Sequence, residues 1–163
     1  MRRHFLAVPL LFFLVACNSQ KRAKTEDVLQ EKIVSSEKIR AFLNDANYNL
    51  VNTVELMVLF DIQKSLIEGT TDEYSNKVVL NDTLSNQQTL QLVELLKDDA
   101  SYVWDAPDED PTFDPSLQVL LKKEGQRLFI LVDEERKKLG FINLEGQRVV
   151  KYNSAIASGF KNL

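Results

Sequence analysis

The sequence predicts an α+β fold: a mainly antiparallel sheet with a C-terminal four-strand meander and two to three helices. Two observations predict it. A tetrapeptide occurs twice near the end of the chain, each time between short apolar segments, and a strong capping motif opens an amphipathic segment before them. The length of 163 residues, with 44% apolar and 27% charged residues, suits one globular core rather than a disordered or polytopic chain.

The chain begins with the three-part layout of a secretory signal peptide over residues 1–16. Arg2 and Arg3 form its basic start, and residues 5–16 are apolar. As a helix this run rises about 18 Å, whereas a bilayer core of about 30 Å needs roughly twenty residues. The run is therefore expected to be removed. The stretch Arg2-Arg3-His4-Phe5-Leu6 also contains the core of a twin-arginine signal, which leaves export after folding as an alternative.

The tetrapeptide Leu14-Val15-Ala16-Cys17 closes the apolar run and resembles the lipobox of bacterial lipoproteins. The resemblance implies cleavage between Ala16 and Cys17, a diacylglyceryl group on the Cys17 sulfur, and acylation of the freed amine. Cys17 then attaches the protein to a membrane of the bacterial cell envelope. Asn18 stands where Gram-negative lipoproteins kept at the inner membrane commonly have Asp, so the outer membrane is favoured if the cell has two. The alternative is an ordinary buried thiol.

Composition excludes several partners and reactions. Removal of Arg2 and Arg3 lowers the 20 basic side chains to 18 against 24 acidic ones, so the net charge falls from −4 to −6 and nucleic acid is not an expected partner. His4 is the only His and Cys17 the only Cys. Residues 18–163 therefore lack Ser-His-Asp, Cys-His and Cys/His zinc sites. The sequence predicts no catalytic residue, metal or cofactor.

The polar residues after the signal, with the lipidated Cys17, predict a flexible tether over 17–26, and 27–163 are expected to form a single globular domain. Near-helical spacing of apolar residues predicts a helix over 28–42, although 38–43 also suits a short strand. A further strand is predicted over 77–80.

Residues 54–60, with the sequence V-E-L-M-V-L-F, give two readings. The short run rich in Val and Leu favours a buried strand followed by a turn. Asn52 and Glu55, spaced as a capping box, and Gly69 as a stop leave a helix as the alternative.

Ser85, followed by Gln88 at the third position, predicts the start of a helix over 86–97. The four apolar residues that form one face of this helix are Leu92, Val93, Leu95 and Leu96. This face is expected to cover one side of the sheet.

The meander is predicted from Glu-Gly-Gln-Arg repeats at 124–127 and 145–148. Gly125 and Gly146 are expected to hold the positive φ that tight hairpins need. The all-charged segment 133–138 is predicted as the outward turn between the hairpins. The strands are expected at 116–122, 128–132, 139–144 and 149–152. The second of these is apolar at every position, which predicts a central strand covered on both faces, on one by the 86–97 helix and on the other by the first helix or a partner. A short helix is expected near 154–160.

Between these elements lies a loop that is acidic and rich in proline. No Lys or Arg occurs between Asp98 and Leu121, and prolines at 107, 111 and 115 exclude a regular helix or central strand. Two ligand hypotheses follow: a weak calcium site, or an acidic-aromatic pocket for a cationic ligand or basic peptide. The alternative is a solvated loop whose aromatic residues return to the core. The candidate ligand residues are Tyr102, Trp104, Asp105, Asp108, Asp110, Phe113 and Asp114.

The stretch from Leu90 to Phe160 is also loosely similar to small bacterial exported proteins of uncharacterised role, which carry cysteines where Asp, Pro and apolar residues stand here. No function comes with that resemblance. The sequence therefore favours a lipid-anchored envelope protein that acts as a non-enzymatic binding or structural module, with an envelope protein as a further partner. The alternatives are a small carboxylate-dependent envelope hydrolase and an accessory or inhibitor subunit of an envelope complex.

Overall fold

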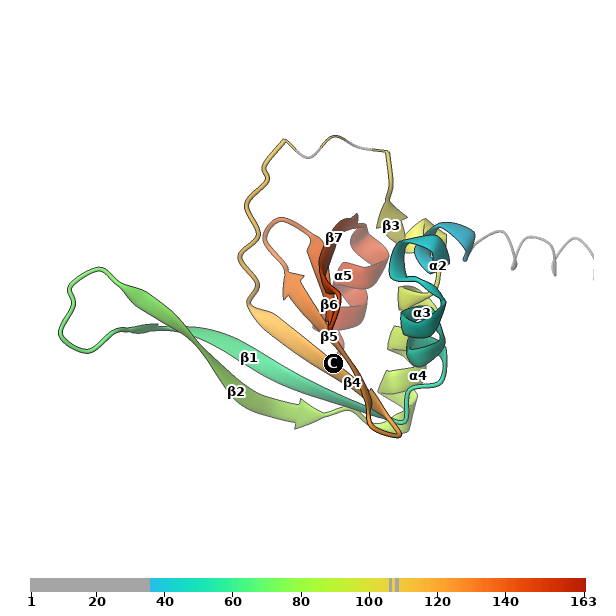
Figure 1. Ribbon diagram of the computed structural model, residues 1–163, viewed down its shortest axis with the longest axis horizontal. Helices are drawn as coiled ribbons and strands as arrows, with labels where there is room; N and C mark the ends of the chain where they lie inside the picture. Colours follow the sequence, from blue (N-terminus) through green and yellow to red (C-terminus); the bar gives the residue numbers. More distant parts are fainter. Residues whose placement is uncertain (1–35, 106, 108) are drawn as a thin grey trace, which may run out of the picture. The chain divides into compact units, whose positions relative to one another are not determined.

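The fold is known from a computed structural model that describes residues 36–105, 107 and 109–163 (Figure 1). The signal peptide, Cys17, the tether and the first part of the helix predicted over 28–42 lie outside the described residues. The helices are α2 (Glu37–Leu43), α3 (Asp45–Asn52), α4 (Asn86–Leu96) and α5 (Ser154–Lys161), with a short 3-10 turn η1 (Asp99–Ser101). The strands are β1 (Leu56–Leu66), β2 (Tyr74–Thr83), β3 (Tyr102–Val103), β4 (Leu117–Lys123), β5 (Gln126–Asp133), β6 (Lys138–Asn143) and β7 (Gly146–Tyr152).

The described part of the chain is a mixed α+β fold with one seven-stranded antiparallel sheet. The strand order β2-β1-β4-β5-β6-β7-β3 places the last four long strands side by side in chain order. The predicted four-strand meander and the C-terminal helix are therefore confirmed. The expected number of helices is corrected, because the described residues contain four α-helices rather than two or three.

Helix α4 begins as predicted. Ser85 accepts from the Gln88 backbone N–H, while the Gln88 side chain accepts from Ser85, which completes the capping box. The capping-box alternative at Asn52 is excluded, because residues 56–66 form strand β1. Helix α3, which the sequence pattern did not predict, is capped instead by Asn44, whose side chain accepts from the Asn47 N–H at 3.0 Å.

All four helices contribute buried residues to one core on the inner face of the sheet. The inner face is formed by alternate residues of the strands, of which Leu128, Ile130 and Val132 on β5 are fully buried. Phe129 and Leu131, which point to the opposite face, are only half-buried. β5 is the central strand of the sheet, as predicted. Cover of its second face by the first helix is wrong, because α2 contributes to the same core as α4; cover of that face by a partner stays a prediction.

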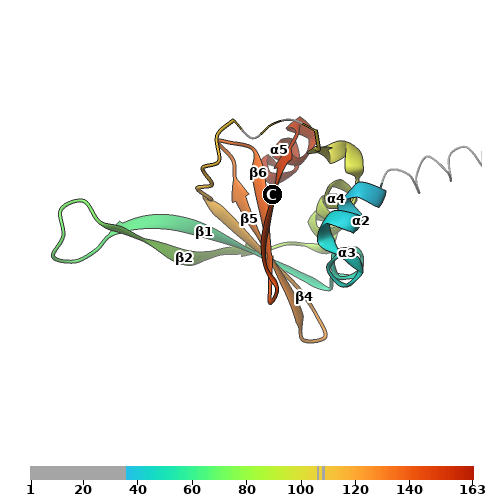
Figure 2. The same ribbon diagram turned by 45° about the horizontal axis from the view of Figure 1, so that its top comes forward.

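Strands β1 and β2 extend beyond the rest of the sheet as a long hairpin (Figure 2). Pairing of β1 with β4 ends at Asp61↔Leu117, whereas pairing with β2 continues to Leu66↔Tyr74. Residues 62–78, called the arm here, therefore extend past the pairing of β1 with β4. Besides the bonds within the hairpin, the Ile62 N–H donates to the Ser116 carbonyl at 2.8 Å and Lys64 pairs with Asp114, which join the base of the arm to the proline-rich segment. Gly69 lies in the hairpin loop with φ +83°, so it closes a hairpin and ends no helix.

The two Glu-Gly-Gln-Arg repeats form hairpins that differ by one residue in register. Lys123 pairs with Gln126, so the first turn is Glu124-Gly125; Asn143 pairs with Gly146, so the second is Leu144-Glu145. Gly125 (φ +89°) and Gly146 (φ +131°) both hold the expected positive φ. Because side chains alternate between faces, the one-residue shift places the two repeat arginines on opposite faces of the sheet.

Candidate binding surface

The outer face of the sheet carries many apolar side chains beside basic ones such as Lys122 and Arg127, and none of the apolar side chains described on it is buried. Along β1, β4, β5, β6 and β7 these residues alternate with buried ones, and pairing with Phe60 and Ile62 places Leu80 and Val78 of β2 on the same face. We call this set the outer sheet face: Leu56, Val58, Phe60, Ile62, Val78, Leu80, Leu120, Phe129, Leu131, Ile142 and Val149, all half-buried or exposed.

The apolar character is strongest along β2. Leu80 is 64% exposed, Val78 48% and Tyr74 61%, and all three lie on the outer face. The opposite side of the arm carries polar residues, such as Gln63 and Lys77. Alternation of this kind normally turns the apolar side toward a core. On the arm it faces solvent, and a large exposed apolar patch is typical of an interaction site.

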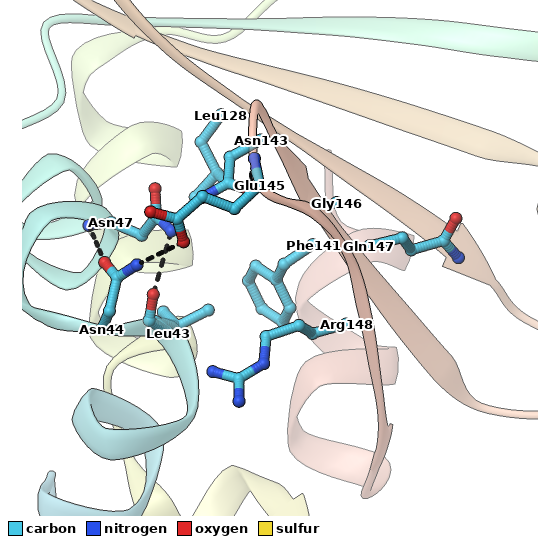
Figure 3. Close-up of a pocket in the computed structure, with 10 residues that line it drawn as sticks. All are labelled: Leu43, Asn44, Asn47, Leu128, Phe141, Asn143, Glu145, Gly146, Gln147 and Arg148. Atoms are coloured by element: carbon cyan, nitrogen blue, oxygen red, sulfur yellow. Dashed lines mark hydrogen bonds between the residues drawn. The ribbon is translucent and has the colours of Figure 1, made fainter.

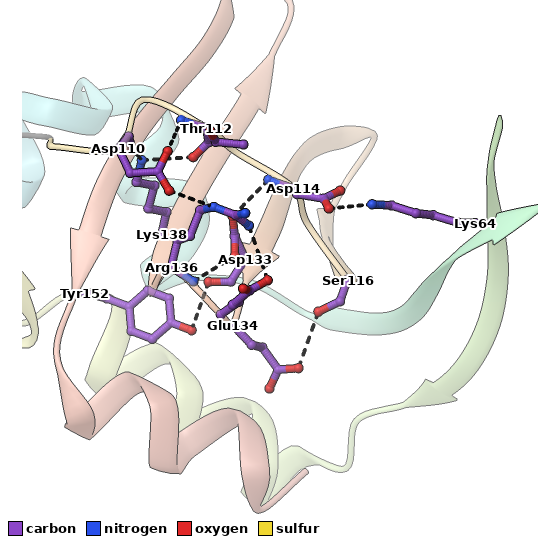
Figure 4. Close-up of polar contacts among 11 residues, drawn as sticks. Lys64, Asp110, Thr112, Asp114, Ser116, Asp133, Glu134, Arg136, Lys138 and Tyr152 are labelled. Atoms are coloured by element: carbon purple, nitrogen blue, oxygen red, sulfur yellow. Dashed lines mark hydrogen bonds and ion pairs between the residues drawn. The ribbon is translucent and has the colours of Figure 1, made fainter. Parts of the chain in front are cut away.

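Part of the outer face is covered by the proline-rich loop (Figure 4). The Lys138 ammonium, almost fully buried, donates to the carbonyl oxygens of Asp110 and Thr112, the latter at 2.9 Å. Phe113 lies directly over Gly140, where a Cβ atom would stand 2.7 Å from the ring. Gly140 therefore leaves the space in which the loop docks.

The loop is fixed to the sheet by a buried carboxylate. Asp133 is fully buried and accepts from the backbone N–H of Asp114 at 2.8 Å and of Arg136 at 2.9 Å. The predicted outward turn over 133–138 is corrected at both ends, because Asp133 and Lys138 are buried, paired residues of β5 and β6. Only residues 134–137 form the turn.

Basic residues far away in sequence pair with the loop's carboxylates. Arg136 lies 3.1 Å from the Asp110 carboxylate, which also accepts from Thr112; the Thr112 and Arg136 hydrogen bonds lower the pKa of Asp110 to about 2. The Lys64 ammonium, 2.5 Å from Asp114, lowers the pKa of that carboxyl group. Lys64 and Arg136 therefore partly neutralise the acidic loop, which contains no basic residue of its own.

The predicted ligand residues do not converge on one site. Tyr102 is buried and donates to the Leu96 carbonyl at 2.5 Å, and burial raises the pKa of its phenol above the ordinary range. Trp104 packs edge-on against Phe42, with ring centroids 5.9 Å apart, and joins the inner core, whereas Phe113 lies on the outer face.

The acidic members of the set are also spread out. Asp105 pairs with Lys38 at 3.6 Å, near α2, while Asp110 and Asp114 face the sheet; Asp108 lies outside the described residues. In the part of the chain that the structure describes, no group of three or more His, Cys, Asp or Glu is placed to hold a metal ion. The aromatic residues return to the core or sheet, as the solvated-loop alternative expects.

A separate pocket of about 300 Å³ lies between the α2–α3 junction and the β6–β7 turn (Figure 3). Asn44 donates to the Glu145 carboxylate at 3.2 Å, and the Arg148 guanidinium donates to the Phe42 carbonyl while lying 5.2 Å from that ring's centre. The second repeat thus joins the helices to the sheet, which its sequence did not predict. The residues that line the pocket are Leu43, Asn44, Asn47, Leu128, Phe141, Asn143, Glu145, Gly146, Gln147 and Arg148.

This pocket bears on the hydrolase alternative. Among the residues that the structure describes, Glu145 is the one carboxylate that lines the pocket, whereas a glycosidase uses two carboxyl groups about 5–10 Å apart across the bond that is cleaved. The pocket therefore lacks the acid pair that such a reaction requires.

Among residues 36–105, 107 and 109–163, no helix has the length and hydropathy needed to cross a membrane. Comparison with known protein families, with curated proteins and with solved structures finds no match to this chain.

Proposed function

We propose that this chain is a lipid-anchored protein of the bacterial cell envelope that works as a non-enzymatic binding module, with the outer sheet face as its binding surface. The observation that carries the proposal is the set of apolar residues that six adjacent strands place on one face, none of which is buried. Leu80 and Val78 remain largely exposed to solvent in the folded chain, as apolar residues of an interaction site do.

The surface has the composition of an interface centre. Phe129, Leu131 and Ile142 lie on adjacent strands, with Phe129 directly opposite Ile142. Aromatic and aliphatic side chains that are depleted of charge are typical of the part of an interface that becomes fully desolvated. Of the charged residues on or near this face, Lys64 and Arg136 pair with loop carboxylates, whereas the exposed Lys122 and Arg127 lie opposite each other on the face itself.

Membrane attachment rests on the resemblance of residues 14–17 to a lipobox. If Cys17 carries the lipid, Cys17→Ala removes the only thiol available for it. We expect this variant to lose all incorporation of a palmitate analogue and to leave the membrane fraction, because two or more acyl chains are what stable anchoring requires. Metabolic labelling of the full chain checks this. Label retained in the variant, or wild-type protein recovered free of membranes, would contradict the lipoprotein assignment.

The binding surface is tested by placing a photo-crosslinking amino acid at Phe129, on the outer sheet face, in cells that make the full chain. We expect adducts with one discrete partner, since the half-buried Phe129 lies on the central strand of the outer sheet face. The same amino acid at Leu90, which is 65% exposed on α4, is the matched control, because Leu90 is an apolar residue outside the sheet.

A second substitution on the same face keeps the test specific. Val149→Asp changes an exposed residue two strands away and should abolish the Phe129 adduct without unfolding the protein, since Val149 is 41% exposed. If Leu90 and Phe129 gave the same adducts, or if Val149→Asp left the adduct unchanged, the outer sheet face would not be the binding surface.

A further inference from the structure

Near the β4–β5 turn, the outer sheet face carries two basic side chains that lie opposite each other. Lys122 pairs with Arg127 across β4 and β5, and both residues are exposed. The Lys122 carbonyl accepts from the Glu55 N–H at 3.2 Å, so the backbone groups of Lys122 point to β1. The pair with Arg127 is therefore a non-hydrogen-bonded one, in which the side chains lie closer together. Like charges in such positions repel each other and destabilise a sheet.

The described part of the chain does not neutralise this basic pair. Within it, neither the Lys122 ammonium nor the Arg127 guanidinium makes an ion pair or a hydrogen bond. Among the described residues, the one acid that strand pairing places on this face is Asp133, which is fully buried and accepts from the backbone of the proline-rich loop. The strands therefore present two uncompensated positive charges to a partner.

Apolar side chains adjoin the basic pair on the same face. Leu56 lies opposite Lys122 on β1 and is 38% exposed. Two residues further along β4 and β5, Leu120 lies opposite Phe129, and both are half-buried. Residues two positions apart on a strand lie about 7 Å apart on one face. A carboxylate and an apolar side chain of one short segment can therefore contact the basic pair and these apolar residues together.

The other end of this face already holds a segment of that composition, the chain's own proline-rich loop (Figure 4). The Phe113 ring of the loop lies against the glycine of β6. The Asp110 carboxylate pairs with Arg136 at 3.1 Å, and the Asp114 carboxylate pairs with Lys64 at 2.5 Å. An extended acidic segment with an aromatic side chain is thus bound by this face and by the basic residues beside it. The uncovered end, with its own basic pair, continues the same kind of surface.

We propose that the uncovered end of the outer sheet face binds an extended acidic segment of a partner protein. A carboxylate of the segment lies between Lys122 and Arg127, and an aromatic or aliphatic side chain packs on Leu120 and Phe129. The proposal rests on the binding function above and names the chemistry of its partner. The bound carboxylate replaces the repulsion between two like charges by two ion pairs. An anionic bilayer is a poorer match, because it would also meet the acidic loop on this face.

Arg127→Glu, made in the full chain that carries the photo-crosslinking amino acid at Phe129, tests the proposal in cells. We expect the adduct to fall about tenfold or more, because the new carboxylate repels the acidic segment. The urea midpoint of the variant should rise, since the new carboxylate lies opposite Lys122. Arg127→Lys keeps the charge and should keep most of the adduct. Lys77→Glu, at an exposed position on the polar side of the arm, is the matched control and should leave the adduct unchanged.

Mass spectrometry of the parent adduct should find Asp or Glu beside the crosslinked residue of the partner, and changing that acid to Lys should restore the adduct with Arg127→Glu. Three results would overturn the proposal and leave the binding function intact: an adduct unchanged by Arg127→Glu, a urea midpoint lowered by it, or a crosslinked segment without acidic residues. Phospholipid as the sole adduct would overturn it and assign the face to the bilayer. No adduct at Phe129 in the parent chain would refute the binding function, and this proposal with it.

Discussion

Replacing Asp133 with alanine is expected to lower the free energy of unfolding by about 3–5 kcal/mol, the cost of removing one member of a buried charged network. The Asp133 carboxylate is fully buried, and its loss leaves the N–H groups of Asp114 and Arg136 without their acceptor. The midpoint of a urea titration followed by circular dichroism measures the effect. Protease sensitivity of the 104–116 loop should rise in the same variant.

Glu135→Ala is the control, because Glu135 lies two residues away with a side chain that is 83% exposed. Its expected change is within about 0.5 kcal/mol, as for surface substitutions in general. The loss of unfolding free energy for Asp133→Asn should lie between those of Asp133→Ala and Glu135→Ala, since the amide keeps the shape of the carboxylate and one acceptor oxygen. Equal midpoints for Asp133→Ala and Glu135→Ala would show that the buried carboxylate does not hold the loop.

Valine at Gly125 or Gly146 is expected to cost about 1–3 kcal/mol, because a β-branched residue is forced to positive φ. No atom lies within 4 Å of the Cβ position at either glycine, so the cost comes from the backbone and not from a clash. Gln126→Val, at an exposed strand position next to the first turn, is the control. Urea midpoints equal to the parent's for both glycine variants would exclude these backbone conformations.

Substitution of each glycine by asparagine should distinguish the two turns by its effect on stability. Gly125 has φ +89° beside Glu124 at φ +47°, close to the left-handed region that Asn tolerates, whereas Gly146 at φ +131° lies where essentially only glycine is found. Gly125→Asn should therefore be nearly neutral and Gly146→Asn should destabilise. Equal effects at the two positions would contradict the difference in register.

The sequence predicted the elements in which local signals agree. The Ser85 capping box, the glycine turns and the apolar runs of the meander each act within a few residues, and each is confirmed. Helix α3 was missed because its sequence, D-A-N-Y-N-L-V-N, is poor in strong helix formers. The helix is stabilised instead by its N-cap residue Asn44, which accepts from the Asn47 N–H and donates to the Glu145 carboxylate.

The candidate sites depended on contacts between distant residues, which pattern reasoning does not see. The acidic loop lacks basic residues of its own, yet Lys64, 50 positions away, pairs with Asp114. The outer sheet face was missed for a different reason. Residues 128–132 are apolar at every position, and this pattern was interpreted as a strand covered on both faces. The same pattern also describes a strand with one buried face and one half-buried apolar face.

The order of the strands has a consequence for biosynthesis. Within the meander, neighbouring strands are joined by short turns, so their pairing closes small loops, whereas pairing of β1 with β4 joins Asp61 to Leu117 across the whole of β2 and α4. Because a chain is made from its N-terminus, the β1–β2 hairpin is complete before β4, the neighbour that anchors it, exists. During that interval it is an amphipathic ribbon with two open edges. Until β4 pairs with β1, each of these edges can pair with another strand.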